Sequence, residues 1–129
     1  MKKLILMLAA AMMAGAIVWS VSAQAKKEGT LRHVVCFKYK ATATEEQIQK
    51  VENDFRALKS KISGIKTFEC GVNVSPEKLN KGITHAFQLS FGTEADRDVY
   101  LKHPDHQAFA KSLGPVLDDV FVMDYWAKP

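Results

Sequence analysis

The sequence is poor in cysteine and glycine, and it lacks the motifs of several enzyme classes. Two cysteines without a CxxC pair argue against a structural zinc site, and seven scattered glycines form no phosphate-binding loop. Neither GxSxG nor HExxH occurs, which argues against a serine hydrolase or a zinc protease. The chain of 129 residues is 47% hydrophobic and 25% charged, and this composition is that of a small globular domain.

The net charge of +4 suggests nucleic-acid binding only at first sight. The lysines are spread along the chain, and the three arginines, Arg32, Arg56 and Arg97, lie far apart in the sequence. Nucleic-acid binding needs basic side chains that are gathered on one surface. We therefore expect no nucleic-acid partner.

The first 25 residues resemble a secretory signal peptide. Lys2 and Lys3 precede an uncharged apolar run over residues 4–18, and small residues at Ala23 and Ala25 suit a signal peptidase. We predict cleavage after Ala25, with cleavage after Ala23 as the alternative, and export to the periplasm or the extracellular space. A retained membrane anchor is the other interpretation, because the run approaches the roughly 20 residues that span a bilayer.

Removal of residues 1–25 would leave a short tail, residues 26–30, and one domain, residues 31–126. The mature protein would then have no membrane segment. It would also lie in an oxidising compartment, where disulfides form. The sequence does not show whether Cys36 and Cys70 are oxidised, and two cysteines that serve as small core hydrophobes are the simpler interpretation.

Hydrophobic periodicity predicts the order strand, helix, strand, strand, helix, strand. Alternating apolar residues predict strands at 31–39, 65–74, 83–91 and 120–126. A capping box at Thr44 begins the first predicted helix, which ends near Ser63-Gly64. Thr93 caps the second predicted helix, and Pro104 is expected to break it.

This order is that of an α+β, ferredoxin-like βαββαβ fold, a four-stranded antiparallel sheet with helices on one face. The first strand carries apolar residues on both faces, with Val34 and Cys36 opposite Val35 and Phe37, and residues 120–125 repeat the pattern. Buried apolar area stabilises by about 25 cal/mol per Å², so an open apolar sheet face favours association. We therefore predict a homodimer that packs sheet against sheet.

Short motifs along the domain resemble the stress-responsive dimeric α/β-barrel (Dabb) family. In order they are HVV and FKYK within residues 33–40, FECGVNVS at 68–75, GITHA and SF within 82–91, YLKHPDHQAF at 100–109 and VMDY at 122–125. The resemblance implies that two ferredoxin-like subunits pair into a barrel. It does not imply one activity, because members range from plant stress proteins to a polyketide cyclase and fold does not fix function.

All four histidines lie in these motifs, His33 and His85 on predicted strands and His103 and His106 around Pro104. A neutral imidazole can take a proton from a carbon acid or a phenol, and a tyrosine hydroxyl can position a substrate oxygen. In the cyclase member a tyrosine and a histidine of this helix region are thought to share that work. The resemblance therefore implies Tyr100 and His106 as the catalytic pair.

We expect a ligand cavity between the sheet and the helices, lined by His33, His85, Phe37, Phe87 and Phe109. Structural roles are the alternative for each histidine, above all for His103, because a histidine at a helix start can bond backbone amides.

Two functions follow from these features. The first is an exported homodimer without established catalysis, which is either a module that binds a small apolar or aromatic compound or a stress-associated module. The alternative is a cofactor-free lyase, cyclase or isomerase with His106 as the base and Tyr100 as the oxygen partner. We expect no cofactor and no metal. Two alternatives stay open: heme, which related dimeric barrels hold, and a metal site built from His33, His85 and His106 with Asp124 or Glu69.

Overall fold

The computed structural model describes residues 29–129, which form one antiparallel sheet and three helices. The elements are β1 (Leu31–Tyr39), α1 (Glu45–Lys61), β2 (Thr67–Val72), β3 (His85–Phe91), α2 (Glu94–Lys102), α3 (Pro104–Ser112) and β4 (Leu117–Trp126). The strands pair in the order β2-β3-β1-β4, which confirms the ferredoxin-like prediction. The predicted signal peptide and most of the predicted tail lie outside the described residues. Within residues 29–129, no helix is long and apolar enough to cross a membrane.

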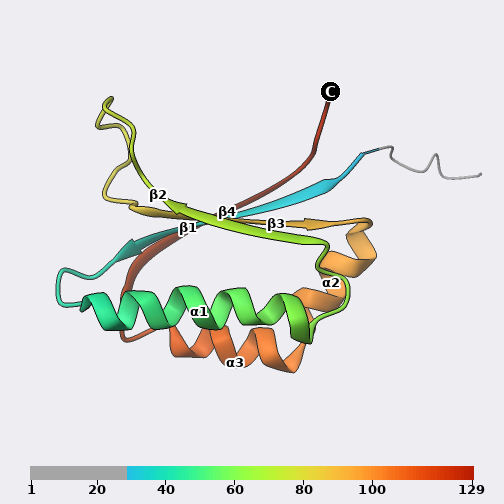
Figure 1. The fold of residues 1–129 in the computed structure, drawn as a ribbon, viewed down its shortest axis with the longest axis horizontal. Coiled ribbons are helices and arrows are strands. Elements are labelled where there is room, and N and C mark those ends of the chain that lie inside the picture. The colour runs from blue at the N-terminus through green and yellow to red at the C-terminus, as the bar shows by residue number, and fades with distance from the viewer. Residues whose placement is uncertain (1–28) are drawn as a thin grey trace, which may run out of the picture.

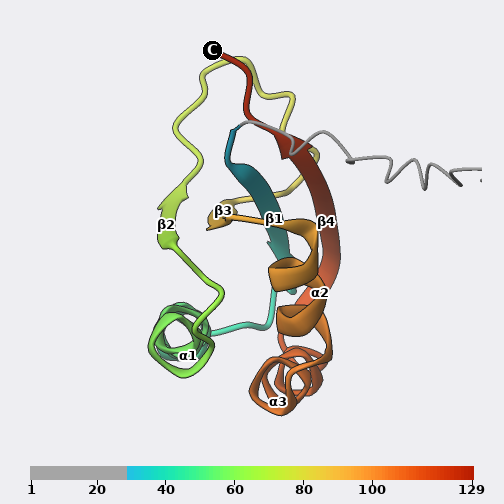
Figure 2. The same ribbon diagram turned by 90° about the vertical axis from the view of Figure 1, so that its right-hand side faces the viewer.

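The three helices cover one face of the sheet and leave the other face open (Figure 1). Seen along the sheet, α1 lies under β2 and α3 under the opposite side (Figure 2). The core fills the space between the two layers. Its central side chains, Phe37, Phe55, Phe87 and Leu89, are at most 1% exposed. The helices are therefore held by aromatic packing against β1 and β3.

The helix ends follow the local signals in the sequence. Thr44 accepts a hydrogen bond from the Gln47 amide and the Gln47 side chain accepts one from the Thr44 amide, so the capping box is confirmed. The side chain of Thr93 caps α2 in the same way through the Asp96 amide. The predicted break at Pro104 is also confirmed, because α2 ends at Lys102 and Pro104 begins α3.

The limits of three strands differ from the sequence prediction. β2 and β3 are shorter than predicted, although backbone bonds from the Lys66 and Asn73 amides continue their pairing beyond the strand ends. β4 begins at Leu117, three residues before the predicted start. Aspartates 118 and 119 are poor strand formers, yet a bulge in β4, with Asp118 as the extra residue, lets Leu117 pair with Tyr39. Pairing with β1 therefore overrides the local preference.

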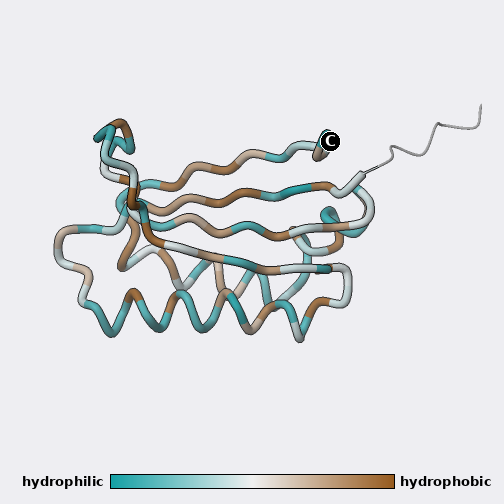
Figure 3. The backbone as a smooth tube through the Cα atoms, turned by 45° about the horizontal axis from the view of Figure 1, so that its top comes forward, coloured by the Kyte–Doolittle hydropathy of each residue, from teal (hydrophilic) through white to brown (hydrophobic). Residues whose placement is uncertain are grey.

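The open face carries apolar residues on its two neighbouring strands β1 and β4, as predicted. Phe121, Met123 and Tyr125 lie on this face and Val120 and Val122 on the helix side, and all five are between 42% and 51% exposed. Figure 3 shows the hydrophobic stretches that alternate along the strands. The connection between β2 and β3, residues 73–84, rises from the sheet on its open side (Figure 1).

Candidate functional site

A cavity of about 400 Å³ lies between the sheet and the helices α2 and α3. Its wall is apolar, with Phe37, Phe109 and Val122 among its residues. The polar side chains on the wall come from three elements and are His33 of β1, Tyr100 of α2 and His106 of α3. An apolar cavity with a few converging polar groups is the usual form of a small-molecule site.

His33 is held by a carboxylate on the neighbouring strand. Asp124 lies directly opposite His33 in the β1–β4 register, and His33 Nδ1 is 2.6 Å from Asp124 Oδ1. The second carboxylate oxygen accepts a hydrogen bond from Arg97 Nη1. Burial alone would raise the pKa of Asp124, but the bonds from His33 and Arg97 hold that pKa below its ordinary value. Asp124 is therefore ionised and accepts from the protonated Nδ1.

Tyr100 stands between the two cavity histidines. Its ring centroid is 5.4 Å from that of His33 and 4.3 Å from that of His106, and the residue is 1% exposed. Within residues 29–129 no hydrogen bond from its hydroxyl to another residue is found. Burial, with the nearby Asp124 charge, raises the pKa of Tyr100, so the hydroxyl stays protonated. The group is available to a ligand in the cavity.

The break between α2 and α3 orients His106. In an unbroken helix the Leu101 carbonyl would accept from the amide four residues later, but the Asp105 amide donates to His103 Nδ1 instead. Leu101 O accepts from His106 Nδ1 at 3.1 Å, which leaves Nε2 without a proton when the ring is neutral. Burial lowers the pKa of His106, and the neighbours His33 and His103 lower it further. The ring can therefore act as a base near neutral pH.

Five of the seven predicted site residues line this one cavity: His33, Phe37, Tyr100, His106 and Phe109. Phe87 does not reach the wall. It is 1% exposed and lies in the core, with its ring 4.9 Å from that of Phe37 and 4.9 Å from that of Phe55. The prediction that Phe87 lines the cavity is therefore replaced by a packing role.

The placement of His85 in the same cavity is wrong. Antiparallel pairing sets His85 opposite Phe37, while Leu89 lies opposite His33, so four residues, roughly 13 Å of strand, separate the two histidines. His85 lines a second depression of about 560 Å³. There its Nδ1 is 2.8 Å from Thr84 Oγ1, and burial lowers its pKa.

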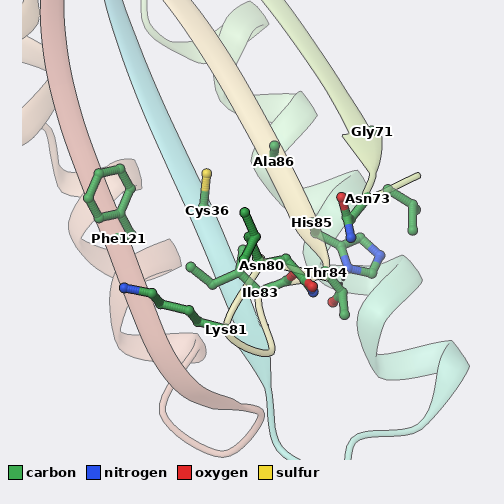
Figure 4. A pocket seen from close by; sticks show the side chains of 12 residues that line it. Cys36, Gly71, Asn73, Asn80, Lys81, Ile83, Thr84, His85, Ala86 and Phe121 are labelled. Atoms are coloured by element: carbon green, nitrogen blue, oxygen red, sulfur yellow. Dashed lines mark hydrogen bonds between the residues drawn. The ribbon is translucent and has the colours of Figure 1, made fainter. Parts of the chain in front are cut away.

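The second depression lies at the connection between β2 and β3. Figure 4 shows Cys36, Ala86 and Phe121 on three neighbouring strands, with Asn80 and other residues of the connection beside them. Its wall is mostly apolar and opens onto the sheet face that carries no helix. This position suits contact with a second protein surface.

The cysteines lie on opposite faces of the sheet and are free. Cys36 pairs with Phe121 on the open face, whereas Cys70 pairs with the core residue Phe87 on the helix side. Both residues are half-buried. Cys70 packs against the core and therefore fits the interpretation as a core hydrophobe, whereas Cys36 on the open face does not. A disulfide between them is excluded by this geometry.

The alternative metal ligands do not converge. His85 is remote from His33, and Glu69 pairs with Gln88 on the face opposite the cavity. Within residues 29–129, no group of three potential metal-ligating side chains is found.

Sequence reasoning missed Arg97 and considered Asp124 only as a metal ligand. The signal for Asp124 is its position on the inward face of the last strand, which also carries Val120 and Val122. A charge on an apolar face needs a partner. Arg97 lies three residues before Tyr100, on the same side of α2, and could have been proposed as that partner.

The comparisons with known proteins agree with this geometry. A family model described as the stress responsive A/B barrel domain matches residues 31–127. The stress-response A/B barrel domain-containing protein HS1 of Arabidopsis thaliana is 33% identical over 98 residues, 76% of this chain and 90% of the relative. Olivetolic acid cyclase of Cannabis sativa is 23% identical over 95 residues, 74% of this chain and 94% of the cyclase.

Two solved structures are similar over the same region. A hydroxynitrile lyase from Passiflora edulis superimposes with a TM-score of 0.73 at 26% identity, covering 78% of this chain and 94% of the lyase. A protein from Bacteroides fragilis, described as dimeric with a ferredoxin-like fold, superimposes with a TM-score of 0.62 at 30% identity. That match covers 78% of this chain and 98% of the other.

Proposed function

The chain belongs to the stress-responsive A/B barrel domain family, and we propose that it works as a homodimer that binds a small apolar or aromatic compound in the cavity. The observation that carries the proposal is the convergence of His33, Tyr100 and His106 on one apolar wall. The tyrosine hydroxyl, with no partner among the described residues, and the free Nε2 of His106 offer a donor and an acceptor to the same ligand atom. A ligand that carries a hydroxyl on an apolar or aromatic body fits this arrangement.

A second candidate function is cofactor-free acid–base catalysis. His106 has the unprotonated Nε2 and lowered pKa of a base. A protein named as a hydroxynitrile lyase shares the fold, and one named as a cyclase is similar in sequence. For a hydroxynitrile, Nε2 would take the hydroxyl proton while the bond between carbon and the nitrile breaks. The aldehyde forms, and the proton returns to cyanide as hydrogen cyanide. Tyr100 would hydrogen-bond the substrate oxygen.

The homodimer is supported by the solved relative described as dimeric. We infer that two copies meet through the open sheet faces. Phe121, Met123 and Tyr125 remain 42% to 48% exposed there, and the depression next to Cys36 opens onto the same face. Covering these groups removes apolar area from water, which is the main source of affinity between subunits.

We also propose export, with residues 1–25 removed as a signal peptide. The support is the lysine start, the apolar run and the small residues at Ala23 and Ala25. Mass spectrometry of the protein recovered outside the cytoplasm is expected to give an N-terminus at Lys26 or, with the alternative cleavage, at Gln24. A protein that keeps Met1 and sediments with membranes would contradict export as a free protein.

A spectrophotometric titration tests ligand binding. The probe is para-nitrophenol, whose neutral and ionised forms absorb differently. We expect saturable binding that weakens roughly two- to tenfold in Tyr100→Phe and in His106→Gln, the usual effect of one lost hydrogen bond. His85→Gln, outside the cavity, is the matched control and should bind as the wild type does. Binding that persists when Ala110→Trp fills the cavity would place the ligand elsewhere and overturn the proposal.

Turnover is tested separately with mandelonitrile as the substrate. If the second candidate function holds, the wild type releases cyanide and His106→Gln slows the reaction roughly 10²- to 10⁴-fold. A rate equal to that of buffer alone would leave binding as the function of the cavity.

A further inference from the structure

We propose that Arg97 is a positioning residue for the cavity, which acts through Asp124 to hold His33 with its proton on Nδ1 and its unprotonated Nε2 available to a ligand. The inference rests on the proposed function, because it assigns a role to a residue behind the wall of the same cavity. Arg97 itself is not on that wall. It belongs to α2, which is joined to β4 by the bond from Arg97 to Asp124.

Hydrogen bonds join Arg97 to Asp124 and Asp124 to His33, and the series ends at the buried imidazole. Side-chain exposure is 21% for Arg97, 24% for Asp124 and 5% for His33. Each carboxylate oxygen of Asp124 has its own partner, Oδ1 with His33 and Oδ2 with Arg97. Two partners fix the plane of the carboxylate, whereas His33 alone would leave it free to rotate about its last bond.

Arg97 is in turn held from its own helix. Its Nε donates to Asp98 Oδ1 at 2.8 Å, while Nη1 donates to Asp124. A guanidinium is planar and has its donors in a fixed fork, so two bonds set its orientation. Lysine carries the same charge but lacks the planar fork, so it cannot reproduce the geometry of both bonds. The arrangement therefore depends on arginine geometry as well as on charge.

The tautomer of His33 follows from the ionisation of Asp124. An ionised carboxylate only accepts hydrogen bonds, so the proton between the two groups must sit on Nδ1. A protonated carboxyl could donate instead, and the imidazole proton would then move to Nε2, the nitrogen available to a ligand. The positive charge of Arg97 favours the ionised form of Asp124 and therefore the Nδ1–H tautomer of His33.

The groups that face His33 come from three elements. Asp124 lies on β4, Arg97 and Tyr100 lie on α2, and His106 lies on α3. Arg97 and Asp124 together carry no net charge, and the positive charge is engaged with carboxylates. With both imidazole rings neutral, the cavity offers two unprotonated nitrogens and one hydroxyl. Such a wall suits a neutral hydroxyl compound better than an anion.

Nitrogen-15 NMR of the histidine-labelled mature chain tests the inference without any ligand. We expect the His33 signals of the Nδ1–H tautomer in the wild type and a shift toward the Nε2–H tautomer in Arg97→Gln. Arg97→Lys, which keeps the charge, should retain more of the Nδ1–H form than Arg97→Gln does. If Arg97→Gln does not fold, Arg97→Lys carries the comparison with the wild type, and any gain of the Nε2–H form supports the proposal.

The matched control is Glu94→Gln. Glu94 also joins α2 to β4, because its Oε1 accepts from Trp126 Nε1 at 3.1 Å, but it is not part of the series of bonds from Arg97 through Asp124 to His33. A purely structural effect of loosening α2 would appear in both variants, whereas the proposed effect appears only at Arg97. We expect para-nitrophenol to bind roughly two- to tenfold more weakly to Arg97→Gln and with unchanged affinity to Glu94→Gln.

Two results would overturn the inference: Nε2–H at His33 in the wild type, or a tautomer that no Arg97 variant changes. These outcomes are separate from the failure of the proposed function, which would show as absent para-nitrophenol binding in the wild type. The tautomer of His33 is measured without a ligand, so the NMR experiment still tests the role of Arg97 when para-nitrophenol does not bind.

Discussion

Tyr100 is a buried residue whose hydroxyl has no hydrogen-bond partner within residues 29–129. Loss of a hydroxyl costs stability mainly when a buried partner is left unpaired. We therefore predict that Tyr100→Phe changes the free energy of unfolding by no more than about 0.5 kcal/mol, as measured by urea denaturation. A loss above about 1.5 kcal/mol would show that the hydroxyl serves the fold and not a ligand.

The pKa values of His106 and His85 predict how stability depends on pH. Both are lowered below the ordinary histidine value of 6.5, mainly by burial. As the pH falls below that value, the unfolded chain binds protons that the folded chain refuses, so the free energy of unfolding decreases. We expect this decrease between about pH 7 and pH 5, and a smaller one in His106→Gln and in His85→Gln.

The measurement is urea denaturation, at each pH, of the wild type, the two single variants and the double variant that carries both substitutions, in which the decrease should be smallest. An identical pH dependence in the wild type and in the double variant would show that these two histidines are not the groups that titrate.

At the residue scale, part of the site could be predicted from the sequence. Tyr100, His106 and His33 lie in motifs that resemble a family, and Phe37 and Phe109 follow from apolar periodicity. Arg97 lies outside both signals, and its link to Asp124, 27 positions away on another element, could be proposed only from the need of a charge on an apolar face for a partner. His85 was misplaced because a strand pattern gives the face of a residue but not its position along a neighbouring strand.

At the scale of elements, the break between α2 and α3 does most to shape the cavity. Pro104 has no amide proton, and the Asp105 amide donates to His103 Nδ1, so the Leu101 carbonyl is left to His106 and Gln107. The break was visible in the sequence as a proline within an amphipathic pattern. The orientation of His106 could not be predicted, because it depends on which backbone carbonyl loses its helical hydrogen bond.

The cap on α3 gives a prediction at this scale. His103→Ala removes the side-chain acceptor for the Asp105 amide and should cost about 1 kcal/mol in urea denaturation. His103→Asn supplies another good capping acceptor and should recover most of that loss. Equal stability of the alanine variant and the wild type would show that the cap does not hold α3 in place.

The limits of β4 show that pairing between strands overrides local sequence preference. The start of β4 was predicted too late because its two aspartates disfavour a strand. In the structure, Asp118 forms an ion pair with Lys38 at 2.8 Å, and Leu117 pairs with Tyr39 beyond a bulge. Such contacts join residues about 80 positions apart and cannot be deduced from a window of sequence.

At the scale of the whole molecule, the open face leads to a prediction about assembly. Phe121→Glu places a charge in the centre of the proposed contact and should raise the dimer dissociation constant roughly thirtyfold or more. Val99→Glu is the matched control, because Val99 is an exposed apolar residue on α2, at 60% exposure. Sedimentation equilibrium measures both, and equal dissociation constants would contradict a contact through the open face.

The most direct measurement of the central claim is a crystal structure of the protein grown with para-nitrophenol. We predict two copies with their open sheet faces together, and one phenol in each cavity with its oxygen in hydrogen-bond range of Tyr100 and His106 Nε2. A phenol bound outside the cavity, or copies that leave Phe121 and Met123 in solvent, would contradict the account.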